Sequence, residues 1–315
     1  MDKIKKEVYV VIIFVFFILA ISSLATAGIF DWFKRTITGY ATSQTENVSI
    51  IVSGANQITM IIFNQSLTGT NVDPTENATT YVTFYVVIND SDGVNDINDS
   101  SVSSNATFGS TVRRNSTCTL VGDLDSQRAN YSCRLDMWYF DAPETWTINV
   151  RANDLGNTSY VVNTSSFKYN QLQSIVIYPN SLTFPSVATG ATNQTSNNDP
   201  TVVNNTGNYN VTNGNVQINA IDLYGQTTAT ERIFAANFSA HDITGGSNQE
   251  CAGTALVNGT NTGIGVANIT RGNISVNDGN TGQEQLYYCL RKVPSDISSQ
   301  TFSTSTAGSW TVRIV

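Results

Sequence analysis

Positive charge is scarce in this chain of 315 residues. It has 16 Lys and Arg against 24 Asp and Glu, a formal net charge of −8, and after Lys34 only two lysines, Lys168 and Lys292. Such a surface offers no basic patch to the phosphates of nucleic acids or to anionic lipids. We therefore expect no nucleic-acid partner, and membrane contact only through the N-terminal segment.

Catalytic and metal-binding signatures are also few. His241 is the only His, no Cys-x-x-Cys spacing occurs, and there is no Gly-rich phosphate loop. Zinc sites are built mainly from Cys and His ligands, so these residues do not predict one. Ser239 and Asp242 flank His241, but neighbours in sequence do not make a catalytic triad. We predict a protein that is not an enzyme and requires no cofactor, apart from a candidate structural calcium ion described below.

Long apolar runs are confined to the N-terminus. Lys3, Lys5 and Lys6 precede an apolar run at residues 8–21, and Ala25-Thr26-Ala27 forms a small-residue cleavage site. This pattern predicts a secretory signal peptide at residues 1–27, followed by a linker at residues 28–46. The alternative is an uncleaved signal-anchor helix, since residues 8–30 are long enough to span a bilayer. In both cases the rest of the chain is extracellular, secreted or tethered at the cell surface.

Acceptor sites for N-glycosylation are abundant, in contrast to charge. The chain has 35 Asn, and Ser and Thr make up 71 of its 315 residues, so chance gives about eight N-x-[ST] tripeptides. It has seventeen: Asn47, Asn64, Asn77, Asn89, Asn98, Asn105, Asn115, Asn130, Asn157, Asn163, Asn193, Asn204, Asn210, Asn237, Asn258, Asn268 and Asn273. The twofold excess predicts an exported glycoprotein with these residues in exposed loops.

The four cysteines fall into two local pairs. Cys118 and Cys133 lie in the first half of the chain, and Cys251 and Cys289 lie in the second. An oxidising compartment favours one disulfide within each pair, although buried free thiols remain an alternative. A disulfide lowers the chain entropy of the unfolded state. This effect should stabilise the fold by about 3 kcal/mol for the pair that closes the shorter loop and by about 4 kcal/mol for the pair that closes the longer one.

Alternation of apolar and polar residues dominates beyond the leader, which predicts an all-β fold of short strands separated by Gly, Asn, Asp and Ser. In the first half the pattern predicts strands at residues 48–53, 58–63, 80–88, 117–121, 130–140, 145–152 and 159–169. In the second half it predicts strands at residues 174–178, 201–204, 215–223, 232–238, 252–256, 264–269, 285–291 and 309–315.

The two halves repeat one plan. Each has a Tyr-x-Cys tripeptide, ending at Cys133 and at Cys289, and each later has a Trp-Thr strand, beginning at Trp146 and at Trp310. Alternate residues of a strand share one face, so Trp146, Ile148 and Val150 should face one core, and Trp310, Val312 and Ile314 the other. We expect two tandem β-sandwich domains, at residues 47–170 and 171–315.

Tyr-x-Cys resembles the tyrosine corner of immunoglobulin domains, in which the Tyr lies two residues before the second Cys. Neither segment between paired cysteines contains the Trp of true immunoglobulin domains, so the resemblance implies Ig-like sandwiches, not membership of the vertebrate superfamily. Composition, the leader, residues 32–44 and residues 204–225 also resemble Asn- and Thr-rich secreted or surface glycoproteins of archaea. That resemblance implies an extracellular β-domain protein and carries no binding residues.

The densest acidic stretch is residues 89–99. Its carboxylates, Asp90, Asp92, Asp96 and Asp99, are hard oxygen ligands on a Gly-containing loop, which is the chemistry that calcium requires. The spacing does not match an EF-hand, and sequons at Asn89 and Asn98 place glycans in the same loop. The alternative is a loop of Asx turns without a metal.

These features predict a structural or adhesive cell-surface glycoprotein, with other surface proteins or glycans as partners. One alternative is a carbohydrate- or protein-binding adhesin. Trp138 and Phe140 share a strand face, and an outward Trp138 could stack on a sugar, but we expect burial against the core. Another is a self-associating filament subunit that exchanges strands between copies at its sheet edges.

Overall fold

The computed structural model describes residues 58–63, 70–115, 117–155, 160–242, 247–274 and 281–315. The chain divides into two compact units, and the unit Ser53–Val315 contains all of these residues. The expected leader, linker and first strand (residues 1–27, 28–46 and 48–53) lie outside the described residues. None of the described helices is long and apolar enough to cross a membrane.

The fold is all-β, as the alternation of the sequence predicts. Neighbouring strands run antiparallel throughout the described sheets, apart from the short parallel pair β2–β9. In the described ranges the only α-helix is α2 (Ser247–Glu250), a single turn, and three 3₁₀ turns occur: η1 (Val94–Asp96), η2 (Asp99–Ser101) and η3 (Ala235–Asn237).

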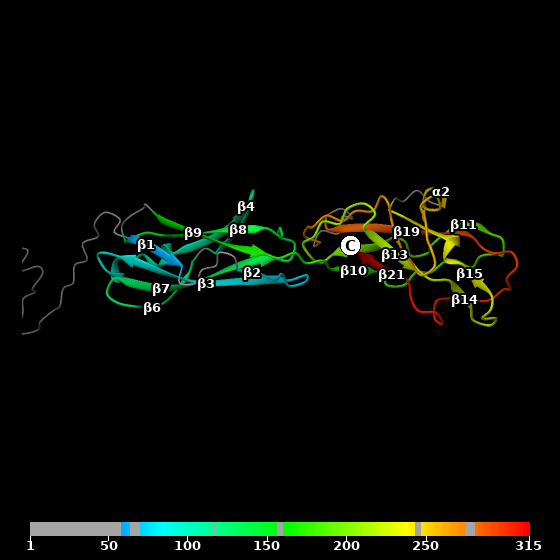
Figure 1. Cartoon of the computed structure of the whole chain (residues 1–315), viewed down its shortest axis with the longest axis horizontal. Helices are drawn as coiled ribbons and strands as arrows, with labels where there is room; N and C mark the ends of the chain where they lie inside the picture. The colour runs from blue at the N-terminus through cyan, green and yellow to red at the C-terminus, as the bar shows by residue number, and fades with distance from the viewer. Residues whose placement is uncertain (1–57, 64–69, 116, 156–159, 243–246, 275–280) are drawn as a thin grey trace, which may run out of the picture. The chain divides into compact units, whose positions relative to one another are not determined.

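The first set of strands forms two sheets in the described residues, one with the order β1-β3-β7-β6 and one with the order β2-β9-β8-β4-β5 (Figure 1). The bounds are β1 (Ile58–Phe63), β2 (Asn71–Val72), β3 (Thr79–Asp90), β4 (Ser103–Phe108), β5 (Thr111–Asn115), β6 (Thr119–Asp123), β7 (Arg128–Trp138), β8 (Thr145–Ala152) and β9 (Val161–Tyr169).

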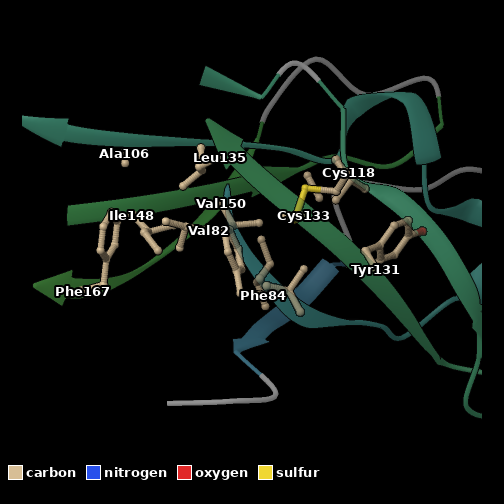
Figure 2. Close-up of a cluster of buried hydrophobic side chains, with 14 of the residues drawn as sticks. Val82, Phe84, Ala106, Cys118, Tyr131, Cys133, Leu135, Ile148, Val150 and Phe167 are labelled. Carbon is tan, nitrogen blue, oxygen red and sulfur yellow. A yellow bond between two sulfur atoms is a disulfide. The ribbon is translucent and has the colours of Figure 1, made fainter. Parts of the chain in front are cut away.

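A single hydrophobic cluster fills the space between these two sheets. Alternate residues of each strand point inward, as they do in β7, where Tyr131, Cys133, Leu135 and Met137 are fully buried. Figure 2 shows side chains of both sheets in this cluster, such as Phe84 and Ile148, with the Cys118–Cys133 disulfide to one side of them. Trp146 is also fully buried, like the two apolar residues that follow it at alternate positions, so the first Trp strand faces the core as predicted. This arrangement is sandwich-like.

The second set of strands encloses a separate hydrophobic cluster drawn from residues 175–314. The bounds are β10 (Ile175–Tyr178), β11 (Thr192–Thr195), β12 (Thr201–Asn205), β13 (Val216–Ala220), β14 (Leu223–Gly225), β15 (Arg232–Ile233), β16 (Phe238–His241), β17 (Thr254–Ala255), β18 (Thr260–Gly263), β19 (Gln283–Lys292), β20 (Phe302–Ser303) and β21 (Thr311–Ile314). Trp310, Val312 and Ile314 pack against this cluster as predicted, but they are only partly buried.

Within the described residues, the second set divides into three sheets. The largest has the order β10-β12-β19-β16-β17, with β11 also pairing with β19. The others have the orders β18-β13-β21 and β15-β14-β20. β19 is the central strand of this half, and its burial on both faces explains why residues 286–290 form a continuous apolar and aromatic run.

One predicted strand is wrong, a second is interrupted, and several strands were not predicted. Residues 232–238 form β15 and the start of β16 with the 3₁₀ turn η3 between them, not one strand. Residues 264–269 form no strand, although Ile269 forms an isolated antiparallel bridge with Val211. The unpredicted strands include β4, β5, β11 and β18, whose sequences are mostly polar. Backbone pairing with neighbouring strands fixes them, and such pairing leaves no apolar alternation in the sequence.

The Tyr-x-Cys tripeptides lie on the long strands β7 and β19. The hydroxyl of Tyr131 donates to Oδ1 of Asp99 at 2.6 Å, and the hydroxyl of Tyr287 donates to Oε1 of Gln285 at 3.0 Å. Both hydroxyl groups thus bond to side chains, and each tripeptide ends at a disulfide cysteine.

Candidate functional site

The predicted calcium ligands lie on the loop that follows β3. Asp90 is the last residue of β3, Asp96 ends η1 and Asp99 begins η2. Gly93 has φ +118°, a conformation that favours glycine, and an added Cβ would lie 3.2 Å from the carbonyl oxygen of Ser126. The backbone conformation and the nearby carbonyl oxygen therefore explain why this position in the acidic stretch is a glycine.

The structure separates the four aspartates into two pairs. Asp90 and Asp96 are buried, whereas Asp92 and Asp99 are exposed. The amide of Asp92 donates to Oδ1 of Asp90 at 2.8 Å, which is the Asx turn expected as the alternative to a metal site. Asp99 accepts a hydrogen bond from the hydroxyl of Tyr131, which lies in the core strand β7.

A fifth carboxylate, Asp154, completes the buried group. It follows β8 and pairs through its backbone with Ile97 in an isolated antiparallel bridge. Burial is the main cause that raises the pKa of Asp90; the nearby Asp154 also raises it, while the hydrogen bond from Asp92 opposes the shift. Burial likewise raises the pKa of Asp96, with further contributions from Asp154 and Asp92. As the side chains stand, the described residues contain no group of three or more His, Cys, Asp or Glu arranged to hold a metal ion.

Both disulfides form with the connectivity that the sequence favours. Cys118 bonds to Cys133, which we call the short disulfide, and Cys251 bonds to Cys289, which we call the long disulfide. Cys118 immediately precedes β6 and Cys133 lies in β7, so the short disulfide joins two neighbouring antiparallel segments. All four cysteines are buried, which protects these bonds from solvent.

The sequon asparagines with described side chains are exposed or half-buried. Asn47, Asn64 and Asn157 lie outside the described residues, as does the side chain of Asn115. None of the other thirteen is buried. Seven are exposed (Asn77, Asn163, Asn193, Asn210, Asn258, Asn268 and Asn273), and six are half-buried (Asn89, Asn98, Asn105, Asn130, Asn204 and Asn237).

Two exposed sequon asparagines have left-handed backbone conformations. Asn77, in a turn, and Asn193, in β11, have φ values of 49° and 55°, in the region that Asn tolerates better than most residues. By contrast, the buried asparagines Asn153, Asn205 and Asn208 are not sequons. In the described residues, full burial of asparagine therefore occurs only outside the sequons.

Trp138 is 44% exposed, so the expectation that it packs into the core is wrong. The phase of β7 is set by Cys133, Leu135 and Met137, which point inward, and Trp138 at the next position must point outward. Its ring stacks on Phe140 at a centroid distance of 6.0 Å and an interplanar angle of 16°.

Trp138 belongs to an exposed group that we call the aromatic face, which consists of Tyr81, Tyr85 and Trp138. Tyr81 and Tyr85 are 58% and 38% exposed and point outward from β3, the strand next to β7. The guanidinium carbon of Arg134 lies 4.3 Å from the ring centroid of Tyr81. Aromatic rings displayed on one strand pair can stack on the apolar faces of sugar rings.

A buried ion pair holds the end of β7 beneath the aromatic face. Asp141 is almost fully buried and accepts the backbone amide of Trp138 at 2.7 Å. The same carboxylate binds the guanidinium of Arg113 through two hydrogen bonds, and this guanidinium lies 5.8 Å from the ring centroid of Phe140. Trp138 is therefore anchored at its backbone while its ring remains accessible.

Two further features remain, the surroundings of His241 and a cavity in the second half. Nδ1 of His241 lies 2.9 Å from Oδ1 of Asp242, but the hydroxyl of Ser239 is buried and donates to the carbonyl oxygen of Glu250. A cavity of about 360 Å³ in the second half is lined by residues such as Phe184, Phe238 and Trp310. Its described lining contains no Asp, Glu, His, Lys, Arg or Cys.

Comparison with protein-family models and with curated proteins finds no match to this chain.

Proposed function

We propose that this chain is a non-enzymatic, N-glycosylated protein of the cell exterior, in which two tandem Ig-like β-sandwich domains serve a structural or adhesive role. The observation that carries the proposal is that none of the thirteen sequon asparagines with described side chains is buried and seven of them are exposed. Two buried disulfides support it, because such bonds persist in oxidising compartments. The leader pattern and the resemblance to archaeal surface glycoproteins point the same way.

The proposed mechanism is passive. Two packed cores and two disulfides hold the strands, and glycans on exposed turns cover a surface that has little charge. Exposed ion pairs such as Arg134–Asp136 contribute little to stability, typically less than about 1 kcal/mol. Glycans and polar side chains would therefore provide the solubility that charge provides in other proteins, and the glycans would also hinder proteases.

Intact mass spectrometry of native material tests this role. We expect a mass above that of the polypeptide, with four cysteines oxidised, in the secreted or surface fraction. Replacing Thr195 by Ala removes the sequon of Asn193 but keeps the asparagine, so it should remove the mass of one glycan. The matched control is Thr192→Ala, which lies in the same strand but outside the sequon triplet. Unmodified protein in the cytosolic fraction would refute the proposal.

The aromatic face supports a second candidate function, binding of glycans by an adhesin. Its three rings are exposed on neighbouring strands, and the backbone of Trp138 is anchored by Asp141. On a glycan array, the full chain should bind and Trp138→Ala should lose binding. Tyr160→Ala is the matched control, because Tyr160 is 46% exposed but lies beside β9 of the other sheet. An array without a hit would remove this candidate.

Assembly into a filament by strand exchange stays a prediction of the sequence. Size-exclusion chromatography of the purified chain separates the outcomes, since a compact monomer at high concentration argues against exchange between copies.

A further inference from the structure

A set of strands in the second half repeats the order of strands in the first. The order β10-β12-β19-β16 matches β1-β3-β7-β6, and the pair β13-β21 matches the pair β4-β8. In β8, Ile148 lies opposite Ala106 of β4. In β21, Val312 lies opposite Ile218 of β13. Both Ile148 and Val312 stand two positions after the Trp of their segment, so β21 is the counterpart of β8.

One strand of the first half has no counterpart in the second. β8 has a neighbour on each edge, β4 on one and β9 on the other. β21 pairs with β13 alone among the strands that the structure describes. β9 also lies next to β1 of the opposite sheet and thus closes one side of the first half. The corresponding place in the second half, beside β21 and next to β10, holds no described strand.

The burial of the two Trp segments differs accordingly. Trp146 and the two alternate residues that follow it are fully buried, and Phe167 of β9 lies opposite Trp146. Trp310 and the two alternate residues that follow it are only partly buried. The missing neighbour strand explains why the second Trp segment faces its core and still remains accessible to solvent.

The cavity of the second half lies at this place. Its lining includes Ile177 of β10, Val312 of β21 and Trp310, and it reaches Phe238 in the core. β10 and β21 lie close together, and each is the outermost described strand of its sheet (Figure 1). An extended peptide that joins a sheet edge gains main-chain hydrogen bonds from the edge and specificity from pockets for its alternate side chains. The second half presents both features together.

We infer that this place binds an extended strand of a separate protein, antiparallel to β21 as β9 is to β8. Because Phe167 of β9 lies opposite Trp146, the partner strand should carry an aromatic side chain opposite Trp310, where that side chain enters the cavity. The described lining of the cavity has no charged residue, and burying an unpaired charge there would be costly. The inward side chains of the partner are therefore uncharged.

The outward face sets a second requirement. Arg313 is exposed, and its counterpart in β8 is Asn149, which lies opposite Thr164 of β9. An acidic side chain at the partner position that corresponds to Thr164 would form a cross-strand ion pair with Arg313. The partner is thus an extended segment with an acidic residue three positions before an aromatic one. This inference goes beyond the proposed surface role and depends on neither the glycans nor the aromatic face.

The backbone of β21 offers hydrogen bonds to such a strand. The amide of Val315 donates to the carbonyl oxygen of Asn215 at 3.1 Å, which continues the ladder between β21 and β13. The backbone groups of successive residues in an antiparallel ladder point to opposite edges of the strand. The amides and carbonyl groups of Val312 and Ile314 therefore point to the edge of β21 that has no described neighbour.

The first half shows which amides of the added strand form these bonds. The amide of Tyr169 donates to the carbonyl oxygen of Glu144, just before β8, at 2.9 Å. By the same alternation, the amide of Ser165 in β9 faces β8 and the amide of Ser166 faces away from it. A partner strand in the same register would direct the amide at the position of Ser165 toward β21.

Calorimetric titration of the purified full chain with a synthetic peptide of the β9 sequence, VVNTSSFKY, tests the inference. We expect saturable binding, and Phe167→Ser in the peptide should weaken it by at least about tenfold, because the aromatic ring no longer fills the cavity. Thr164→Glu in the peptide should strengthen binding by about twofold or more. Arg313→Glu in the chain, an exposed position, should reverse that preference and so confirms the register.

Backbone methylation of the peptide supplies the matched control. N-methylation at Ser165 should remove binding, whereas N-methylation at Ser166 should leave it nearly unchanged, although both changes affect the free peptide alike. A folded chain that gives no heat with millimolar peptide would overturn the inference, and so would equal affinities for the two methylated peptides. Sedimentation of the chain alone as a dimer that the peptide dissociates would make a second copy the donor and refute the assignment to a separate protein.

Discussion

The charge of Asp199 should make the second half less stable at neutral pH than in mild acid. Oδ2 of Asp199 accepts the amide of Tyr288 in β19 at 3.0 Å, while Oδ1 is buried and accepts no hydrogen bond. Burial raises the pKa of Asp199 to about 6 from the ordinary value of 3.8, against the lowering effect of the bonds from Tyr288 and Ser196.

The sign follows from proton linkage. Below pH 3.8 the carboxyl is neutral in both the folded and the unfolded chain, and burial of the neutral group costs little. Between pH 3.8 and about 6 the unfolded chain loses its proton first, so stability falls as pH rises through this window. A pKa near 6 in place of 3.8 corresponds to at most about 3 kcal/mol, and because Asp199 is only half-buried, solvent screening reduces this value; the change in melting temperature should therefore be below about 6–12 °C.

The perturbation is Asp199→Asn, which keeps an oxygen for the amide of Tyr288 and cannot ionise. We expect the variant and the wild type to melt together near pH 3.5, and the variant to melt higher by pH 7. Asp199→Ala is the control: it also lacks the charge but leaves the Tyr288 amide without its acceptor, so it should melt below Asp199→Asn at every pH. A difference between wild type and Asp199→Asn that does not change with pH would refute the reasoning.

Three further changes separate the contributions to stability, each measured by denaturant unfolding of the full chain. Replacing both cysteines of the short disulfide by Ser should lower the free energy of unfolding by about 3 kcal/mol, and the same change in the long disulfide by about 4 kcal/mol. The reason is that the closed loops span 15 and 38 residues. Equal losses near zero would contradict this. Trp146→Ala should lower the free energy of unfolding by about 3–5 kcal/mol and Trp138→Ala by about 1 kcal/mol or less, since of these two only Trp146 is fully buried. A reversed order would contradict the assignment of strand faces. Tyr131→Phe keeps the ring but loses the hydrogen bond to Asp99, at a cost of about 1–2 kcal/mol, whereas an unchanged stability would mean that water replaces that bond.

Strong apolar alternation made the central strands predictable. β3, β7 and β8 carry inward residues at every second position, and the predicted ranges overlap their observed bounds closely. Trp138 is the exception, because its expected burial followed the general tendency of Trp to pack against a core. The alternation along β7, in which Cys133 and Met137 point inward, places Trp138 outside.

Polar strands and long-range partners were not predictable in this way. β4 has the sequence SSNATF, and its place between β5 and β8 depends on pairing with both. Asp154 gives no local signal either, because the bridge between Ile97 and Asp154 depends on how two separate segments meet. The density of carboxylates in the sequence indicates the acidic loop at residues 89–99, but only the fold shows that Asp154 lies next to it.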